Sequence, residues 1–348
     1  MQNIDGSTGN GGGQILRTAL AYAGMAVEPI RVRNIRVDRN PPGLSAQHLA
    51  VVRTIAELCR ADVEGDTLRS TSITFMPEQV PDPGTYEVDV ADYIDGNSAG
   101  SVTLLFQALL WPLLVSGGPC ELRLHGGTHV KWSPPVEYLS DVYLPSLREL
   151  GVHATVECER CGFYPEGRGV LYGQIHGESN TQFSSIERQE RGDLYTVDAC
   201  SAVANLPDHI RRRQAQQTRV VLENQGIPVR METTSPPSSG PGTYVYIHAS
   251  YEHSHAGFVS YGHPGKPAEK VGREAAEAFL RYHESGAPVQ SQLADQLLLP
   301  LSLAEGPSVF RVSEVTDHVR TIAEVVRKLS GTRIRIQDGE NGSTVHIQ

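Results

Sequence analysis

Apolar residues recur at helical spacing in paired stretches along the chain. In the stretch 45–59, Leu49, Val52 and Ile55 lie three residues apart, which is typical of an amphipathic helix with one buried face. The same kind of pattern predicts further helices over 14–24, 101–114, 134–150, 293–303 and 316–329. Short strand-like runs follow the second helix of each pair, at 61–64, 152–156 and 333–336. The pattern therefore predicts two helices and a strand, three times.

The helix pairs are evenly spaced except for one long interval. The first helices start at residues 14, 101 and 293, which are intervals of 87 and 192 residues. The second helices start at 45, 134 and 316, which are intervals of 89 and 182 residues. The pentapeptide Arg-Thr-Ile-Ala-Glu occurs at 53–57 and again at 320–324. The spacing therefore predicts repeats of about 90 residues, with roughly 100 extra residues in the last interval.

We therefore predict an α/β (α+β) fold in which three repeated two-helix-on-sheet units form a large domain. This domain comprises residues 1–183 and 281–348, and a smaller α/β domain, residues 184–280, is inserted in the third repeat. The inserted part has a turn-rich segment at 234–242, followed by a predicted strand at 244–247 and a predicted helix at 269–283.

Charge and hydropathy exclude some classes of protein. The 348 residues include 30 Lys and Arg against 40 Asp and Glu, a net charge of −10, so a protein that coats nucleic acid non-specifically is excluded. Contact with nucleic acid would require a local basic patch. No apolar run approaches the length of a membrane span, and residues 1–5 do not resemble the start of a secretory signal. We expect a cytoplasmic protein without a membrane partner.

Two groups of residues are weak candidates for metal binding. The five cysteines are an odd, sparse set, and Cys158-x-x-Cys161 lacks the second pair of ligands that a structural zinc site usually has. We interpret them as reduced, incidental thiols, with a metal or redox role as the alternative. His248, His253 and His255 lie together in the inserted part, where we interpret them as facing solvent, with metal binding as the alternative.

A glycine-rich turn precedes the first predicted helix. Glycines at the start of a helix let backbone N–H groups approach an anion, so residues 5–13 could bind phosphate or could be only a tight turn. The turn lacks the Lys-Ser/Thr of a P-loop and the spacing of a dinucleotide-binding loop. Basic residues that could contact a phosphate follow it at Arg31, Arg33, Arg36 and Arg39.

Two residues are candidate nucleophiles. Residues 96–100 match the G-x-S-x-G pattern of serine hydrolases around Ser98, with Asp295 and His318 following in the expected order. The acidic segment 88–95 before it argues against the buried strand which that fold requires. His318 begins a predicted helix, where the helix dipole favours a neutral imidazole that can act as a nucleophile. The alternative for His318 is a capping or surface role.

Taken in order, several segments resemble the RNA 3′-terminal phosphate cyclase family over nearly the whole chain. The segments that carry this resemblance are 5–6 and 11–17 (GGGQILR), 42–44 (PGL), 47–49 (QHL), 98–101 (SAGS), 126–128 (GGT), 132–135 (WSPP), 162–165 (GFYP), 240–242 (GPG), 293–297 (LADQL) and His318. The resemblance implies a nucleotidyl-transfer enzyme with the domain organisation predicted above.

The resemblance also implies a reaction and a set of site residues. His318 would attack the α-phosphate of ATP, pass AMP to an RNA 3′-phosphate, and allow the adjacent 2′-hydroxyl to close a 2′,3′-cyclic phosphate. A divalent metal, Mg or Mn, would neutralise the triphosphate. Arg17 and Arg39 would contact phosphate. The residues expected around ATP are Gln14, Arg17, Gln47, Gln107, Pro134, Asp295 and Gln296.

The chain departs from the family pattern at five positions of the expected site. Asn10 stands where the family usually has Glu, Pro41 replaces Lys, Ala46 replaces Arg, His129 replaces Asp, and Gln292 replaces an aromatic residue or His. These departures leave the metal requirement open. They also leave two alternatives to the cyclase: a silent or acceptor-altered member that binds RNA or protein, and, more distantly, a serine hydrolase using Ser98.

Overall fold

The computed structural model describes residues 1–9, 11–93, 98–339 and 342–348. Within these ranges the strands form four four-stranded sheets and one two-stranded pair, and helices pack against the larger sheets. The α/β class is confirmed. Among the described residues, no helix combines the length and the apolar character that crossing a bilayer requires.

The first sheet and its helices come from the N-terminal part of the chain. They are β1 (Gln2–Asp5), α1 (Gly13–Ala26), β2 (Ile30–Arg33), α2 (Ala46–Leu58), β3 (Asp62–Glu64) and β4 (Ile73–Met76). The strand order is β1-β2-β4-β3. The β1–β2 pair is parallel, whereas β2–β4 and β4–β3 are antiparallel.

The second sheet repeats this order as β5-β6-β8-β7, again with the first pair parallel and the other two antiparallel. Its elements are β5 (Gly84–Asp89), the 3-10 helix η1 (Val90–Tyr93), α3 (Val102–Leu114), β6 (Pro119–Gly126), α4 (Val136–Tyr138), the π-helix η2 (Leu139–Tyr143), α5 (Leu144–Arg148), β7 (Ala154–Arg160) and β8 (Gly169–His176).

The third sheet has the order β10-β16-β18-β17 and the same pairing senses. Its elements are β10 (Glu187–Arg188), α8 (Ser291–Ser302), β16 (Ser308–Val312), α9 (Asp317–Ser330), β17 (Ile334–Gly339) and β18 (Gly342–Ile347). A short parallel pair, β9 (Phe183–Ser184) with β15 (Ala304–Glu305), lies beside it. Three sheets of the chain therefore share one strand order.

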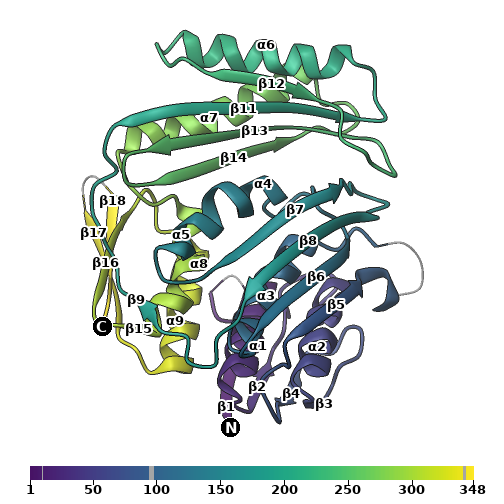
Figure 1. Cartoon of the computed structure of the whole chain (residues 1–348), viewed down its shortest axis with the longest axis vertical. Helices are drawn as coiled ribbons and strands as arrows, with labels where there is room; N and C mark the ends of the chain where they lie inside the picture. Colours follow the sequence, from purple (N-terminus) through teal and green to yellow (C-terminus); the bar gives the residue numbers. More distant parts are fainter. Residues whose placement is uncertain (10, 94–97, 340–341) are drawn as a thin grey trace.

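The helices of these three sheets meet in a common core. Helix α1 contacts α2, α3 and α9, and α9 contacts α8 (Figure 1). The apolar face that the sequence pattern assigned to the first helix is buried, with Ile15, Leu16 and Leu20 at most 1 % exposed. The core thus places the N-terminal ends of α1, α8 and α9, which come from distant parts of the chain, near one another.

The helix predicted over 134–150 is confirmed over residues 136–148, where the chain is helical without a break but changes from α- to π-helical hydrogen bonding in the middle. It begins two residues later and divides into α4, η2 and α5, with Pro145 in the first turn of α5. A proline has no N–H to donate and crowds the carbonyl of the preceding turn, so Pro145 removes one of the regular backbone hydrogen bonds at this position. The wider π-turn η2 accommodates it.

A fourth sheet lies above the other three in Figure 1 and has a core of its own. It contains β11 (Leu194–Ala204), α6 (His209–Glu223), β12 (Arg230–Thr234), β13 (Gly242–Tyr251), β14 (His255–Tyr261) and α7 (Ala268–Ser285), with the order β12-β11-β13-β14. We call these elements the inserted unit and the other three sheets with their helices the large unit. Arg191, just before β11, donates to the carbonyls of Tyr282 (3.2 Å) and His283 (3.0 Å) in α7.

The predicted limits of the insert, residues 184 and 280, stay a prediction. In the structure, residues 183 and 184 both belong to β9, and α7 continues to Ser285.

Candidate active site

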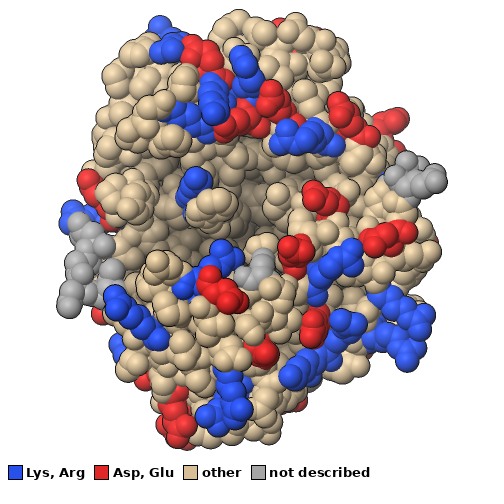
Figure 2. Space-filling view, turned by 180° about the vertical axis from the view of Figure 1, so that it is seen from behind, with Lys and Arg blue, Asp and Glu red and all other residues tan. Residues whose placement is uncertain are grey.

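A cleft of about 1620 Å³ lies between the large unit and the inserted unit. Figure 2 shows a hollow on the rear face of the molecule, with both basic and acidic side chains around its rim. One wall comes from α1, α3, α8 and the start of α9, and the other from β14, α7 and the start of α6. The cleft is therefore bounded by segments that are far apart in the sequence.

Three side chains form a hydrogen-bonded chain at the large-unit wall. Nδ1 of His318 lies 2.6 Å from Oε1 of Gln14, and Nε2 of Gln14 donates to Oδ2 of Asp295 at 2.7 Å. Because the Gln14 amide donates to the carboxylate, its oxygen faces the imidazole and accepts a proton from Nδ1. The ring then carries its hydrogen on Nδ1 and a lone pair on Nε2.

The position of His318 follows from the local sequence. Helix α9 begins at Asp317, and the side chain of its N-cap residue, Thr316, accepts from the Val319 N–H at 3.3 Å. Thr316 therefore holds the N-cap position of α9. His318 is thus in the first turn, where the unpaired N–H groups of the helix disfavour a positive charge.

The electrostatics of the site favour a neutral imidazole. Burial lowers the pKa of His318 below its ordinary value, and the positive charges of Arg17 and Arg39 lower it further. Burial raises the pKa of Asp295 to about 7, opposed by its hydrogen bond from Gln14 and by Arg17. Burial also lowers the pKa of Arg17 to about 10, so its guanidinium is still charged at neutral pH.

Most of the predicted site residues line this one cleft. They are Gln14, Arg17, Gln107, Pro134, Asp295, Gln296 and His318. Arg39 is exposed and acts on the pKa of His318 from outside the lining. Gln47 is not among the lining residues, and its Oε1 accepts from the Ser101 N–H at 3.3 Å, next to the start of α3.

One amide at the cleft is left without a protein partner. Nε2 of Gln107 is buried and has no hydrogen-bond partner among the described residues. A buried donor without a partner costs free energy, so it is a marker for a ligand that accepts a hydrogen bond. Nearby, Oε1 of Gln296 accepts from the Tyr138 hydroxyl at 3.4 Å.

Comparison with known proteins decides the family. The family model described as RNA 3'-terminal phosphate cyclase matches residues 8–336. The chain belongs to the RNA 3′-terminal phosphate cyclase family.

Relatives in this family cover the chain almost completely. An RNA 3'-terminal phosphate cyclase of Gloeothece citriformis is 41% identical over 96% of this chain and 95% of its own length. Those of Methanopyrus kandleri and Pyrococcus furiosus are 39% and 36% identical, over 99% and 97% of this chain and 97% and 95% of their own lengths. Among solved structures, the enolpyruvyl transferase NikO from Streptomyces tendae matches with a TM-score of only 0.23 and 13% identity, covering 100% of this chain and 82% of its own.

The five positions at which the chain departs from the cyclase family pattern lie in different parts of the structure. Asn10 is outside the described residues. The carbonyls of Pro41 and Gly43 accept from Arg36 at 3.4 and 2.7 Å, so Arg36 supports the backbone here. Ala46 is the first residue of α2. His129 and Gln292 both line the cleft.

The basic candidates divide between the cleft and the outer surface. Arg31 and Arg33 lie on β2 and are not among the residues that line the cleft. Arg213, from the basic run in α6, lines it and pairs with Glu269 at 2.7 Å. The described charged side chains of the lining are Arg17, Lys131, Arg213, Lys266, Lys270, Glu274 and Asp295. This acidic protein thus has a basic cleft.

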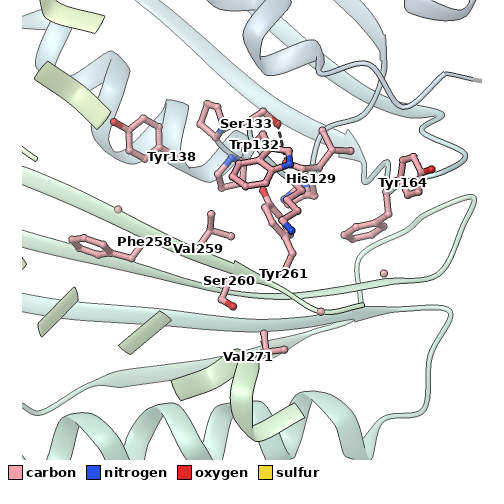
Figure 3. A pocket seen from close by; sticks show the side chains of 18 of the residues that line it. His129, Trp132, Ser133, Tyr138, Tyr164, Phe258, Val259, Ser260, Tyr261 and Val271 are labelled. Atoms are coloured by element: carbon pink, nitrogen blue, oxygen red, sulfur yellow. Dashed lines mark hydrogen bonds between the residues drawn. The ribbon is translucent and has the colours of Figure 1, made fainter. Parts of the chain in front are cut away.

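Two aromatic side chains stand exposed at the cleft. Trp132 is 87% exposed and Tyr164 is 78% exposed, and both belong to its lining. Figure 3 shows Trp132 and Tyr164 on one side of the pocket, with Val259 and Tyr261 of β14 below them. Nζ of Lys131 lies 4.8 Å from the centre of the Trp132 ring. Large exposed apolar rings beside cations are typical of surfaces that stack on nucleic-acid bases.

The serine-hydrolase alternative has no support in this geometry. The Ser98 hydroxyl accepts from the Gly100 N–H at 3.1 Å within its own turn, and part of the G-x-S-x-G motif, residues 96–97, lies outside the described residues. The His318 Nδ1 and the Asp295 carboxylate are both bonded to Gln14.

Sequence reasoning missed one cluster near the cleft. His129, Cys158 and Cys161 come together. The cysteines were interpreted as incidental thiols, with a metal or redox role as the alternative, and His129 was identified only as a departure from the family pattern. The Cys-x-x-Cys spacing was the available signal. Its third member is distant in the sequence and becomes a neighbour only in the folded sheet.

Proposed function

We propose that this chain is an ATP-dependent RNA 3′-terminal phosphate cyclase in which His318 is the nucleophile. The observation that carries the proposal is the hydrogen-bonded chain from Asp295 through Gln14 to Nδ1 of His318. Family membership supports the overall reaction, and the geometry of this chain supports the role of the histidine.

In the first step, Nε2 of His318 attacks the α-phosphorus of ATP. A nitrogen–phosphorus bond forms, the bond from phosphorus to the bridging oxygen breaks, and pyrophosphate leaves with those electrons. Gln14 keeps the proton on Nδ1, so the lone pair that attacks is on Nε2. The imidazole needs no proton removed before it attacks, since it is neutral at physiological pH.

Other residues of the cleft are placed to hold ATP. Arg17 carries a positive charge close to His318 and can offset charge that develops on the phosphates. Arg39, which is exposed outside the cleft lining, can also offset charge on the phosphates. The unpartnered Nε2 of Gln107 offers a hydrogen bond to a ligand acceptor. Pro134 and Gln296 line the same cavity, where a nucleotide base would find both apolar and polar contacts.

In the second and third steps, the AMP group moves to the RNA. An oxygen of the terminal 3′-phosphate attacks the phosphorus of the histidine adenylate, and His318 leaves with the electrons of the nitrogen–phosphorus bond. The neighbouring 2′-hydroxyl then attacks the 3′-phosphorus, loses its proton, and displaces AMP. Ring closure is favoured because the 2′-hydroxyl is already adjacent to the phosphorus it attacks.

The described residues of the cleft do not form an obvious site for a hard divalent cation. Asp295 accepts from Gln14, and Glu274 is paired with Lys266 at 2.5 Å. A magnesium site requires oxygen ligands that are free to coordinate. Labelling with ATP in the presence and absence of a divalent metal measures whether the reaction requires one.

The aromatic and basic side chains of the cleft suit an RNA end. Trp132 and Tyr164 offer rings on which bases can stack, and Lys131, Lys266 and Lys270 supply positive charge for the backbone. Recognition by stacking and charge requires little sequence specificity. This fits a substrate that is defined by its phosphorylated end.

The proposal is tested by incubating the protein with α-³²P-labelled ATP and a divalent metal, followed by denaturing electrophoresis. An acid-labile label is expected on the wild type, as a phosphoramidate requires. It should be absent from His318→Ala and retained in His153→Ala, a control at an exposed histidine just before β7. The cyclase reaction is then measured with an RNA bearing a 3′-phosphate.

Two results would contradict the proposal. A label that persists in folded His318→Ala would show that another residue is the nucleophile. Absence of label with both magnesium and manganese would instead favour a silent member of the family that binds RNA or protein.

A further inference from the structure

We propose that His129, Cys158 and Cys161 bind a thiophilic divalent cation of the zinc type. Each side chain offers one ligand atom, and the three atoms lie within 4.8 Å of one another. Thiolates and imidazole are the ligands that zinc prefers, whereas magnesium prefers oxygen. This site is therefore distinct in chemistry from any cation that accompanies ATP.

The two sulfur atoms have the spacing of a zinc site. Sγ of Cys158 and Sγ of Cys161 are 3.8 Å apart. With zinc–sulfur bonds of about 2.3 Å, the edge of a tetrahedron is about 3.8 Å. The β7–β8 register shifts between Cys158 and Arg160, which is a bulge in the ladder. The bulge changes the alternation of side chains between the two faces of the strand, so Cys158 and Cys161 can face one another.

The hydrogen bonds of His129 leave Nδ1 as the nitrogen that can coordinate. Nε2 lies 2.8 Å from the carboxylate of Glu137, which keeps the ring hydrogen on Nε2. On the other side, Nδ1 lies 2.8 Å from the Thr128 hydroxyl, which itself accepts from the Gly162 N–H at 2.8 Å. The Thr128 proton therefore points to the lone pair of Nδ1. An ion would take the place of this proton as the partner of Nδ1.

Glu137 occupies the place of the carboxylate that commonly orients a metal-bound histidine. Its other oxygen accepts from the Tyr244 hydroxyl at 2.5 Å, so the carboxylate itself is held in place. The His129 side chain is fully buried and stacks on Tyr244, with ring centres 4.5 Å apart. The ligand is thus positioned before any ion binds.

The site lies where the two units of the fold meet. The Cys161 N–H donates to the Pro237 carbonyl at 2.9 Å, and Tyr244 belongs to β13 of the inserted unit. Three protein ligands leave one coordination position for water or another small ligand. An ion here would connect β7 and the turn after β6 next to the inserted unit.

The test uses metal-free, reduced full-length protein titrated with Co²⁺, whose absorption reports thiolate ligands. We expect one ion per chain, a thiolate-to-cobalt charge-transfer band, visible bands of tetrahedral intensity, and displacement by Zn²⁺. Cys158→Ser should remove the charge-transfer band or reduce it strongly, and Cys161→Ser should do the same. Cys200→Ser is the matched control, because Cys200 is a half-buried cysteine outside the cluster, and it should bind as the wild type does.

The orienting role of Glu137 is measured in the same titration. Glu137→Gln should weaken binding by about 10- to 100-fold, as loss of an orienting carboxylate typically does. Circular dichroism establishes that each variant is folded. If Glu137→Gln unfolds the protein, the isosteric serine variants of Cys158 and Cys161 still test the site.

Three results would overturn the proposal. The first is absence of a thiolate–cobalt band in the reduced wild type. The second is a band that is unchanged in both Cys158→Ser and Cys161→Ser. The third is a Cys158–Cys161 disulfide found by mass spectrometry in protein kept with excess zinc, which would assign the pair a redox role instead.

Discussion

Oε1 of Gln14 lies 2.6 Å from Nδ1 of His318, although the two residues are 304 positions apart in the chain. The amide of Gln14 is orientated by Asp295, so a buried carboxylate controls which nitrogen of the imidazole carries the hydrogen. Gln14 is therefore a positioning residue for His318 in the proposed reaction.

Removal of the Gln14 amide should slow adenylylation without unfolding the protein. Gln14→Ala leaves Nδ1 without its acceptor, which should cost about 1.5–3 kcal/mol, or roughly 10- to 150-fold in rate. Single-turnover labelling with α-³²P-ATP measures the rate, and the dependence on ATP concentration separates binding from chemistry. Gln174→Ala, an exposed glutamine on β8, is the control. An unchanged rate in Gln14→Ala would contradict this role.

Loss of the Arg39 charge should move the pH profile of adenylylation. The pKa of His318 is below its ordinary value, so the neutral, reactive ring predominates at neutral pH and is lost as the pH falls through that pKa. Arg39→Gln removes one charge that lowers the pKa, so the acid limb should move to higher pH. Rate measurements from pH 5 to pH 9, roughly the range around an ordinary histidine pKa, show this shift. Arg33→Gln should leave the limb in place, and a limb unaffected by Arg39→Gln would contradict the electrostatic argument.

Trp132→Ala should weaken RNA binding and spare the first chemical step. Stacking of a base on an aromatic ring is worth about 1–3 kcal/mol, so the KM for an RNA with a 3′-phosphate should rise by roughly 5- to 150-fold. Labelling of His318 by ATP should stay within twofold, roughly the error of such assays. Tyr195→Ala is the control, since Tyr195 is also exposed but does not line the cleft. Equal loss of both activities would instead indicate a general defect.

Gly13→Ala should destabilise the protein because of His48. A Cβ at position 13 would lie 1.9 Å from Nε2 of His48, whose Nδ1 is held by Ser45 at the start of α2. Overpacking of this kind typically costs about 1–3 kcal/mol in free energy of unfolding. In a His48→Ala background the same change should be neutral or should stabilise by up to about 1 kcal/mol, because alanine favours helix formation. Urea unfolding of the four proteins in this cycle measures the coupling, and additive effects would contradict the contact.

The sequence pattern was sufficient for the helices that pack one face against the core. The apolar spacing located α1, α2 and α9 to within a few residues, because burial of one face imposes that spacing directly. Over 134–150 it located the helical stretch but not the π-helical residues 139–143 in its middle. Periodicity records which side chains are buried and not whether each N–H has a partner.

The candidate site could be predicted only in part. Gln14, Asp295 and His318 were identified individually through resemblance, but their order in a hydrogen-bonded chain depends on how α1, α8 and α9 pack. The same limit applies to His129 and the two cysteines, whose proximity arises from the end of β6 and a bulge in β7. Such juxtapositions are tertiary, so local spacing contains little information about them.

Arg191 has a consequence for how the inserted unit is connected. It bonds the chain just before β11 to the last turns of α7, so the entry and exit of the inserted unit lie side by side. In the topology of the large unit, the whole inserted unit is therefore one long loop between two neighbouring points of the chain. The free-energy cost of closing a loop, which is entropic, rises only with the logarithm of the loop length, by about 0.6 kcal/mol per doubling. The third sheet can therefore carry a whole folded module at one of its connections while keeping the strand order that it shares with the other two.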